Sequence, residues 1–144
     1  MAGEPILTAI DGSESGERAL ETAIGLAMRF DEELIIVNVE QGYLHGDVAA
    51  APLEASSVEE ILFAASSAIL RKAQEKANRS GLQNIRTFSG LGDPASFIMQ
   101  MVMQEHPEFV IIGRRGKSRF AGLLFGSVTQ KLVALAPCKV LVVP

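Results

Sequence analysis

Residues 109–133 read FVIIGRRGKSRFAGLLFGSVTQKLV. The first four, Phe109 to Ile112, are apolar and indicate a buried strand. An amphipathic helix is predicted to begin near Ser127. The loop between them combines glycines, which let main-chain N–H groups converge on a ligand, with four Lys or Arg residues. Because a helix N-terminus adds unpaired N–H donors and partial positive charge, this stretch predicts an anion site, with phosphate the commonest guest.

The glycines of this loop follow the spacing Gly113-x2-Gly116-x9-Gly126-Ser127. The spacing alone is weak evidence, since glycine makes up about 7% of an average protein. The strand before it and the helix after it strengthen the interpretation. The alternative is a long surface loop with glycine turns and solubilising cations, although loops of this length in compact domains are usually functional or disordered.

Two other phosphate motifs are imitated but disfavoured. Residues 116–118 (GKS) resemble the end of a Walker A loop, which needs a glycine where Ile111 stands. Residues 90–95 (GLGDPA) fit the dinucleotide pattern G-x-G-x-x-A, but they follow the third strand rather than the first. Asp93 would also place a negative charge against the pyrophosphate. Asp93 as a helix N-cap, with Pro94 at the first helical position, explains the residues better.

Composition bounds the class of protein. A chain of 144 residues fits one domain, 1–144, and 48% hydrophobic residues suit a layered α/β core. The net charge of −4 argues against a nucleic-acid partner. A lone cysteine, Cys138, fits a reducing compartment and is expected to be an inert, buried thiol. No apolar run approaches ~18 residues and residues 1–5 do not resemble a signal peptide, so a cytoplasmic protein without a membrane span is expected.

Strands and helices are predicted to alternate along the chain. Residues 40–55 lack a pattern and are expected to form a mobile lid or a disordered hinge. The helices are expected to start at a Ser15 cap, to run from Ser57 to about Asn78 and from Pro94 to about Glu105, and to follow Ser127. The expected strands are Ile6–Ile10, Leu34–Val39, Asn84–Phe88, Phe109–Ile112 and Lys139–Val143.

This alternation predicts a doubly wound α/β fold: a five-stranded parallel sheet in the order 3-2-1-4-5, with helices on both faces. Ligands bind such sheets beyond the carboxyl ends of the strands, where the winding reverses. That crevice lies between strands one and four, so Asp11 and the glycine loop should meet at one edge. Buried faces are also predicted for the second helix (Val58, Ile61, Leu62, Ala65, Ile69 and Ala73) and the last one (Val128, Leu132 and Leu135).

Several motifs together resemble a known family. They are Ala9-Ile10-Asp11-Gly12-Ser13, Gly92-Asp93-Pro94, Ile112-Gly113 through Gly126-Ser127-Val128, Ala136-Pro137-Cys138 and Val140-Leu141-Val142-Val143. On these residues the chain resembles the universal stress protein family, of the ATP-binding kind, whose fold is adenine-nucleotide alpha-hydrolase-like. The resemblance spans the whole chain, and the glycine spacing is its most specific mark.

The resemblance implies a nucleotide site. It assigns Asp11 to the ribose or to a phosphate-bound Mg²⁺, and Val39 to the adenine. Ile112 and Gly113 would lie under the ribose and phosphates. The complete implied set is Ala9, Asp11, Val39, Ile112, Gly113, Arg114, Gly116, Gly126, Ser127 and Val128. Arg114-Arg115 departs from many relatives, and its extra charge would either tighten triphosphate binding or serve another partner.

The implied function is that of a cytoplasmic stress-response or signalling protein that binds ATP or AMP. The resemblance also implies a homodimer through the Lys139–Val143 strand, because an exposed apolar edge needs a cover. A slow ATPase or adenylate-handling enzyme is the alternative, although the only histidines, His45 and His106, suggest no Ser/His/Asp arrangement. A dimeric interaction module without nucleotide is a third hypothesis, which the intact glycine spacing disfavours.

Overall fold

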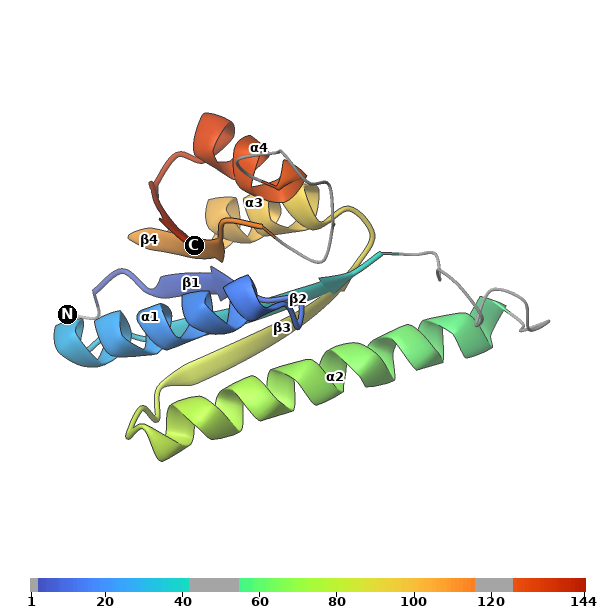
Figure 1. Cartoon of the computed structure of the whole chain (residues 1–144), viewed down its shortest axis with the longest axis horizontal. Coiled ribbons are helices and arrows are strands. Elements are labelled where there is room, and N and C mark those ends of the chain that lie inside the picture. Colours follow the sequence, from blue (N-terminus) through green and yellow to red (C-terminus); the bar gives the residue numbers. More distant parts are fainter. Residues whose placement is uncertain (1–2, 42–54, 116–125) are drawn as a thin grey trace.

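The structure, a computed structural model, describes residues 3–41, 55–115 and 126–144. Its strands are all parallel and lie in the order β3-β2-β1-β4-β5, which confirms the predicted doubly wound sheet (Figure 1). In chain order the elements are β1 (Ile6–Ala9), α1 (Glu14–Phe30), β2 (Leu34–Glu40), α2 (Ala55–Arg79), β3 (Ile85–Leu91), α3 (Pro94–Glu105), β4 (Phe109–Gly113), α4 (Ser127–Leu135) and β5 (Lys139–Val143).

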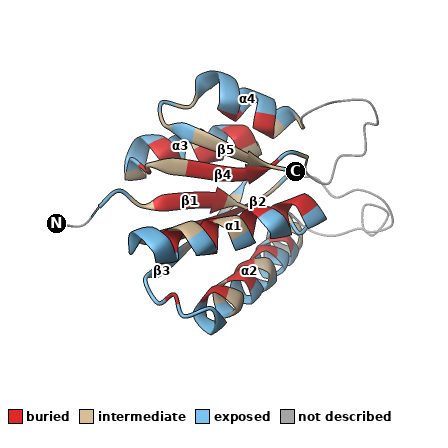
Figure 2. Cartoon of the chain, turned by 60° about the vertical axis from the view of Figure 1, so that its left-hand side comes forward, coloured by how far each residue is buried: buried red, intermediate tan, exposed pale blue. Residues whose placement is uncertain are grey.

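Helices cover both faces of the sheet. α1 and α2 lie on one face, and α3 and α4 lie on the other (Figure 1). Alternate residues of the central strands belong to the two cores: Ile6 and Leu34 pack in the α1/α2 core, whereas Leu7 and Ile35 pack in the α3/α4 core. The central strands are therefore buried on both sides, as Figure 2 shows, which explains why they read as continuous apolar runs.

The start of α1 differs from the prediction. Ser13, not Ser15, is the N-cap, and its hydroxyl accepts a hydrogen bond from the Gly16 N–H. Both serines can cap a helix, so the local sequence does not choose between them. Ser15 instead lies inside the first turn of α1 and is buried.

The buried face of α2 was predicted incorrectly in part. Ile61 is 41% exposed and Ala65 is also exposed, whereas Ser66 is only 1% exposed. The face against the sheet is Leu62, Ser66, Leu70, Ala73 and Ala77. Apolar periodicity could not identify it because one member is polar. The Ser66 hydroxyl is accommodated by a 2.6 Å hydrogen bond with the hydroxyl of Ser89 on β3.

The end of β3 and the exposure of Leu135 also differ from the prediction. β3 continues to Leu91, beyond the predicted Phe88, because β2 supplies ladder partners as far as Glu40. On α4, Leu132 is buried as predicted, but Leu135 is 66% exposed. Leu135 is the last residue of the helix, and the chain leaves at Ala136, so its side chain stays in solvent.

Candidate functional site

Two connections meet where the winding of the sheet reverses. β1 pairs with both β2 and β4, and the last residue pair between β1 and β4 is Ala9 with Ile112. Asp11 therefore lies just beyond the carboxyl end of β1, and Gly113 is the next residue of β4. The predicted convergence of the acidic turn and the glycine loop at one sheet edge follows from this register.

The apolar residues assigned to the site share one face. Ala9, Val39 and Val128 are partly buried against the α3/α4 core, and Ile112 is a member of that core. They come from β1, β2, α4 and β4 respectively. The fold therefore brings four residues that are far apart in the sequence, three on the sheet and one on α4, into one apolar cluster, here called the apolar floor.

The β1–α1 turn is held by its own polar groups. The Asp11 carboxylate accepts a 2.9 Å hydrogen bond from the Ser13 N–H. Gly12 has a φ of 87°, a left-handed conformation that favours glycine. The buried Asn38 on β2 donates a 2.8 Å hydrogen bond from Nδ2 to the carbonyl of Ile10, the residue before Asp11. Asn38 therefore continues the attachment of β1 to the sheet at the point where the chain turns away.

Main-chain hydrogen bonds bring the two ends of the β4–α4 loop together. The Gly126 N–H donates to the Arg114 carbonyl at 2.9 Å, and the Arg114 N–H donates to the carbonyl of Val143 on β5 at 2.6 Å. Thr129 on α4 donates its hydroxyl to the Gly113 carbonyl at 2.8 Å. The loop thus begins and ends at the same place on the sheet edge. Gly116, also assigned to the site, lies outside the described residues.

The helix α4 begins at Ser127, where the sequence predicts it. Gly126 occupies the N-cap position and Ser127 is the first helical residue. The glycine has no side chain, so no side-chain hydrogen bond caps the helix. The N-cap residue of α4 therefore offers no carboxylate or hydroxyl to the first-turn N–H groups of the helix.

Gly113 has a structural reason to be glycine. A Cβ built on it would overlap the Ser15 hydroxyl and lie 2.8 Å from the Ser15 carbonyl carbon. The start of α1 and the end of β4 therefore touch at Gly113 through main-chain atoms. Sequence reasoning assigned Gly113 to a ligand and Ser15 to a helix cap. It missed the contact between them, because this contact has no local signature.

The other glycine motif is part of the fold, as predicted. Gly90 lies within β3, where an added Cβ would be 2.6 Å from the Phe97 ring. Asp93 is the N-cap of α3 and Pro94 its first residue. Hydrogen bonds from the Ser96 hydroxyl and N–H hold the pKa of Asp93 below its ordinary value. The Asp93 carboxylate therefore caps the helix start, which favours the structural interpretation of this motif over the dinucleotide one.

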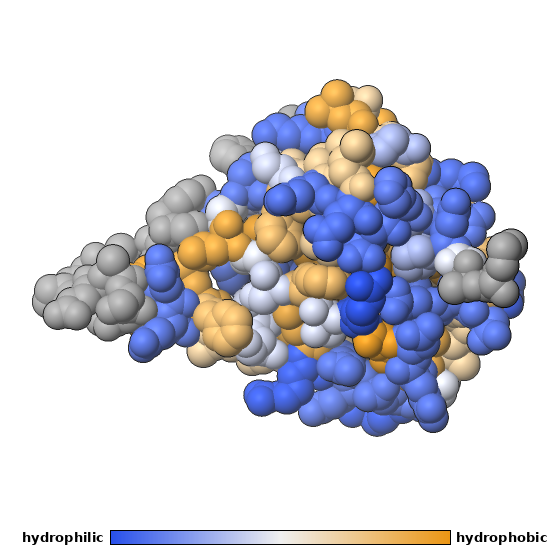
Figure 3. Space-filling model, turned by 180° about the vertical axis from the view of Figure 1, so that it is seen from behind, coloured by the Kyte–Doolittle hydropathy of each residue, from blue (hydrophilic) through white to orange (hydrophobic). Residues whose placement is uncertain are grey.

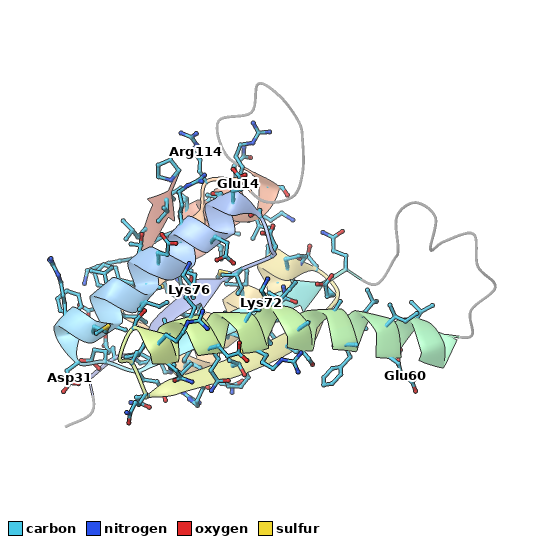
Figure 4. All side chains as sticks on the ribbon, turned by 60° about the horizontal axis from the view of Figure 1, so that its bottom comes forward. Glu14, Asp31, Glu60, Lys72, Lys76 and Arg114 are labelled. Atoms are coloured by element: carbon cyan, nitrogen blue, oxygen red, sulfur yellow. The ribbon has the colours of Figure 1, made fainter. Side chains whose placement is uncertain are left out.

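The remaining charged and reactive groups named in the sequence analysis lie in different parts of the fold. Arg114 is exposed and projects from the same end of the molecule as Glu14 (Figure 4). Cys138 is half-buried, and burial raises the pKa of its thiol, as expected of an unreactive cysteine. His106 ends α3 in a left-handed conformation with a φ of 51°, whereas His45 lies outside the described residues.

The described part of the chain lacks two features. Within residues 3–41, 55–115 and 126–144, no three His, Cys, Asp or Glu side chains gather as a metal-ion cluster. Over the same part of the chain, no helix has the length and apolar character needed to cross a membrane.

A doubly wound sheet with a glycine-rich connection at its reversal point is the design of a small-molecule-binding α/β protein. The chain belongs to the universal stress protein family, whose model matches residues 3–144. A Staphylococcus aureus (strain USA300) protein that carries the universal stress protein name is 33% identical in an alignment of 141 residues, which covers 96% of this chain and 82% of that protein.

Solved structures agree on the fold. Universal stress protein UspA from Lactobacillus plantarum has a TM-score of 0.85 at 23% identity, covering 100% of this chain and 99% of that one. The universal stress protein from Archaeoglobus fulgidus in complex with dAMP has a TM-score of 0.68 at 19% identity, with 100% of both chains covered. At these identities, the similarity supports the architecture rather than individual residue roles.

Proposed function

We propose that this chain is a cytoplasmic stress-response or signalling protein that binds an adenine nucleotide, with ATP as the first candidate. The observation that carries the proposal is the convergence of an apolar floor with an uncapped helix start at the reversal point of the sheet. An adenine ring binds to an apolar surface, and phosphates bind to the N–H groups at a helix start. The related Archaeoglobus protein in complex with dAMP supports the same ligand class.

Each residue has a role in this proposal. Ala9 and Val39 would contact the adenine from the apolar floor. Ile112 and Gly113 would lie under the ribose and phosphates. The phosphates would accept hydrogen bonds from the loop and the start of α4, the segment that contains Arg114, Gly116, Gly126, Ser127 and Val128.

Asp11 would bind the ribose or help to hold Mg²⁺. Mg²⁺ is usually bound through one or two carboxylates plus phosphate oxygens and waters, so a single aspartate beside a polyphosphate fits it without a protein-made cluster. The ion would neutralise phosphate charge. AMP, with fewer phosphate oxygens, would need the ion less.

The strength of such a site can be bounded. A hydrogen bond to a charged group contributes about 1.5–3 kcal/mol. Two or three such bonds at the helix start, together with burial of the adenine, would account for a dissociation constant near the micromolar range, about −8 kcal/mol. No catalytic lysine is required for affinity of this order.

Calorimetry with ATP, ADP and AMP, with and without Mg²⁺, tests the proposal. Gly126→Ala should weaken ATP binding because the added methyl crowds the phosphates. The test is clean because Gly126 has a φ of −70° and a ψ of 163°, which alanine adopts without strain. Gly25→Ala is the matched control, since an added Cβ there meets nothing within 4 Å. Equal ATP affinity in wild type and Gly126→Ala would contradict the role of the loop.

The alternative of a slow ATPase lacks a favourable observation. His106 lies at the end of α3, and the following chain bonds to Pro5 just before β1, through the Glu108 N–H. That is the amino edge of the sheet, opposite Asp11. ATP hydrolysis by the wild type that is lost in Asp11→Ala would support the enzyme hypothesis.

We also propose that residues 1–144 act as one domain and form a homodimer through β5. β5 is an edge strand of apolar residues, and α4 beside it exposes Val133 and Leu135. Figure 3 shows hydrophobic side chains gathered over the end of α4, at the top of the view. A second copy would cover this edge. Sedimentation at tens of micromolar should give a dimer, and a monomer would contradict the proposal.

A further inference from the structure

Asn38 is a polar side chain in the core, and only one half of its amide group is hydrogen-bonded. It is 1% exposed and lies two residues after Ile36 on β2, so it shares the face of the sheet that α1 and α2 cover. Its Nδ2 donates to the Ile10 carbonyl at 2.8 Å. Its Oδ1 is also buried, and no donor among the described residues bonds to it.

The Asn38 amide cannot satisfy Oδ1 by exchanging the positions of its two polar atoms. The exchange would place Oδ1 against the Ile10 carbonyl, where two acceptors would face each other. Ile10 is held in place as well, because its N–H donates to the Val37 carbonyl at 2.9 Å. A buried acceptor without a donor destabilises a fold, and nearly all such atoms in proteins bond to a protein donor or to an ordered water.

Two hydroxyl groups lie beside Asn38. Ser89 is its register partner on β3, and neighbouring strands run about 4.8 Å apart. The Ser89 hydroxyl is 2.6 Å from the hydroxyl of Ser66 on α2, and Ser66 is 1% exposed. Two hydroxyls that bond to each other use only one of their two hydrogens. The serine pair therefore has a second hydrogen to donate, next to an acceptor that lacks a donor.

We propose that this cluster is a binding site for one ordered water molecule, which donates a hydrogen bond to Asn38 Oδ1 and accepts one from the Ser66–Ser89 pair. A buried water needs about two to four polar partners, and these three side chains supply both an acceptor and a donor. Ser89 is exposed on the edge strand β3, so solvent reaches the site from that side. The proposal does not depend on nucleotide binding.

The water connects three elements at the carboxyl edge. Through Asn38 it is linked to the Ile10 carbonyl on the β1 side, and through Ser66 it is linked to α2. α2 extends past the ends of the strands (Figure 1), whereas its contacts with the α1/α2 core, from Leu70, Ala73 and Ala77, lie further along the helix. The hydrated polar cluster therefore holds α2 to the sheet nearer the edge than these apolar contacts do.

A high-resolution crystal structure of the wild type tests the proposal directly, so the test does not depend on a variant that folds. The expected result is a water oxygen about 2.7–3.2 Å from Asn38 Oδ1 and from at least one of the two serine hydroxyls. Its B-factor should be comparable to those of the surrounding core atoms. Electron density without a water at this position would overturn the proposal. A direct hydrogen bond from either serine to Asn38 Oδ1 would overturn it as well.

A double-mutant cycle then measures whether the water couples the side chains in solution. Urea denaturation is compared for the wild type, Asn38→Ala, Ser66→Ala and the double variant. Because a bridging water couples two groups that share no direct bond, the unfolding equilibrium constant of the double variant should be about fivefold below the product of the single effects. Purely multiplicative effects would overturn the bridge.

Thr129→Val is the matched control for Ser66→Ala. It removes a hydroxyl that is 2% exposed and hydrogen-bonded, but that lies on α4, across the sheet from Asn38 (Figure 1). The effects of Asn38→Ala and Thr129→Val on the unfolding equilibrium constant should therefore multiply to within about twofold. Coupling as large as that between Asn38 and Ser66 would show that the cycle reports general destabilisation, and would overturn the water bridge as its cause.

Discussion

Different interactions hold the amino edge of the sheet, where the parallel strands begin, and the carboxyl edge, where they end. At the amino edge, Arg86 at the start of β3 forms ion pairs of 2.7 Å with Glu33 and with Glu105, so its charge is matched by side chains of the protein. At the carboxyl edge, the connections after β1 and β4 are held mainly by main-chain groups and hydroxyls, and the start of α4 has no side-chain cap. Ion pairs between side chains therefore hold the amino edge, whereas the described part of the carboxyl edge is held by main-chain and hydroxyl hydrogen bonds.

Substitutions at the two edges should therefore change different properties of the protein. The amino edge should affect stability without affecting ligand affinity, and part of the carboxyl edge should do the reverse. Even within the glycine spacing, Gly113 is fixed by contact with Ser15, whereas Gly126 meets no such constraint in its backbone angles. Three predictions follow from this division, beginning with the largest effect.

Gly113→Ala should be the most damaging single change. The new methyl would overlap Ser15 and press on its carbonyl carbon, so α1 and β4 would have to separate. Overpacking of this kind costs about 1–3 kcal/mol, and the upper end is expected because main-chain atoms cannot rotate away. Urea denaturation measures the loss. Gly126→Ala, in the same motif, should cost about 1 kcal/mol or less, because alanine adopts the backbone angles of Gly126 without strain and only the preference of an N-cap for glycine is lost. Equal losses in the two variants would contradict the division of roles within the loop.

The fold was predictable because its determinants are local or nearly so. Continuous apolar strands alternating with helices leave few arrangements once right-handed crossovers are imposed. The same sequence placed Asp93 and Pro94 at the start of α3, because a cap is a contact over three residues. It also brought Asp11 and Gly113 to one edge through strand order alone.

Features that depend on distant partners were missed. Ser13 and Ser15 are equivalent candidates for the cap until the Val143 carbonyl, from the far end of the chain, engages Ser15. The prediction for α2 missed that Ser66 is buried, because its hydrogen-bond partner, Ser89, lies on β3. Buried hydroxyls of this kind look like surface residues in a sequence. Hydrogen bonds across 23 to 128 residues decide where they lie.

Arg86→Met is the second prediction and concerns the amino edge. Removing the guanidinium leaves Glu33 and Glu105 close together without their shared cation. Because Arg86 is 43% exposed, solvent screens these pairs, and a loss of about 1 kcal/mol in unfolding free energy is expected. ATP affinity should be unchanged, since the edge lies opposite the proposed site. A fall in ATP affinity comparable to that of Gly126→Ala would break the comparison between the edges.

The smallest expected effect is a pH dependence. Hydrogen bonding to Arg86 holds the pKa of Glu105 below its ordinary value of 4.5. A carboxylate with a lowered folded-state pKa contributes stability above its unfolded pKa and loses it as pH falls through the folded value. The stability difference between wild type and Arg86→Met should therefore be constant above about pH 5 and shrink as the pH falls below 4.5. Denaturation series at several pH values measure it.

Arg86→Lys isolates the geometric part of that dependence. Lysine keeps the positive charge but cannot hold Glu33 and Glu105 through two forked hydrogen-bonding faces at once. Its stability curve should lie between the wild type and Arg86→Met at neutral pH, and all three should converge in acid. Asp93 also has a lowered pKa, but it titrates alike in all three proteins, so its contribution cancels in the differences. A difference that persisted unchanged in acid would mean that Arg86 stabilises the amino edge through its contact with the Phe88 ring, whose centroid lies 5.6 Å from the guanidinium carbon, rather than through its ion pairs.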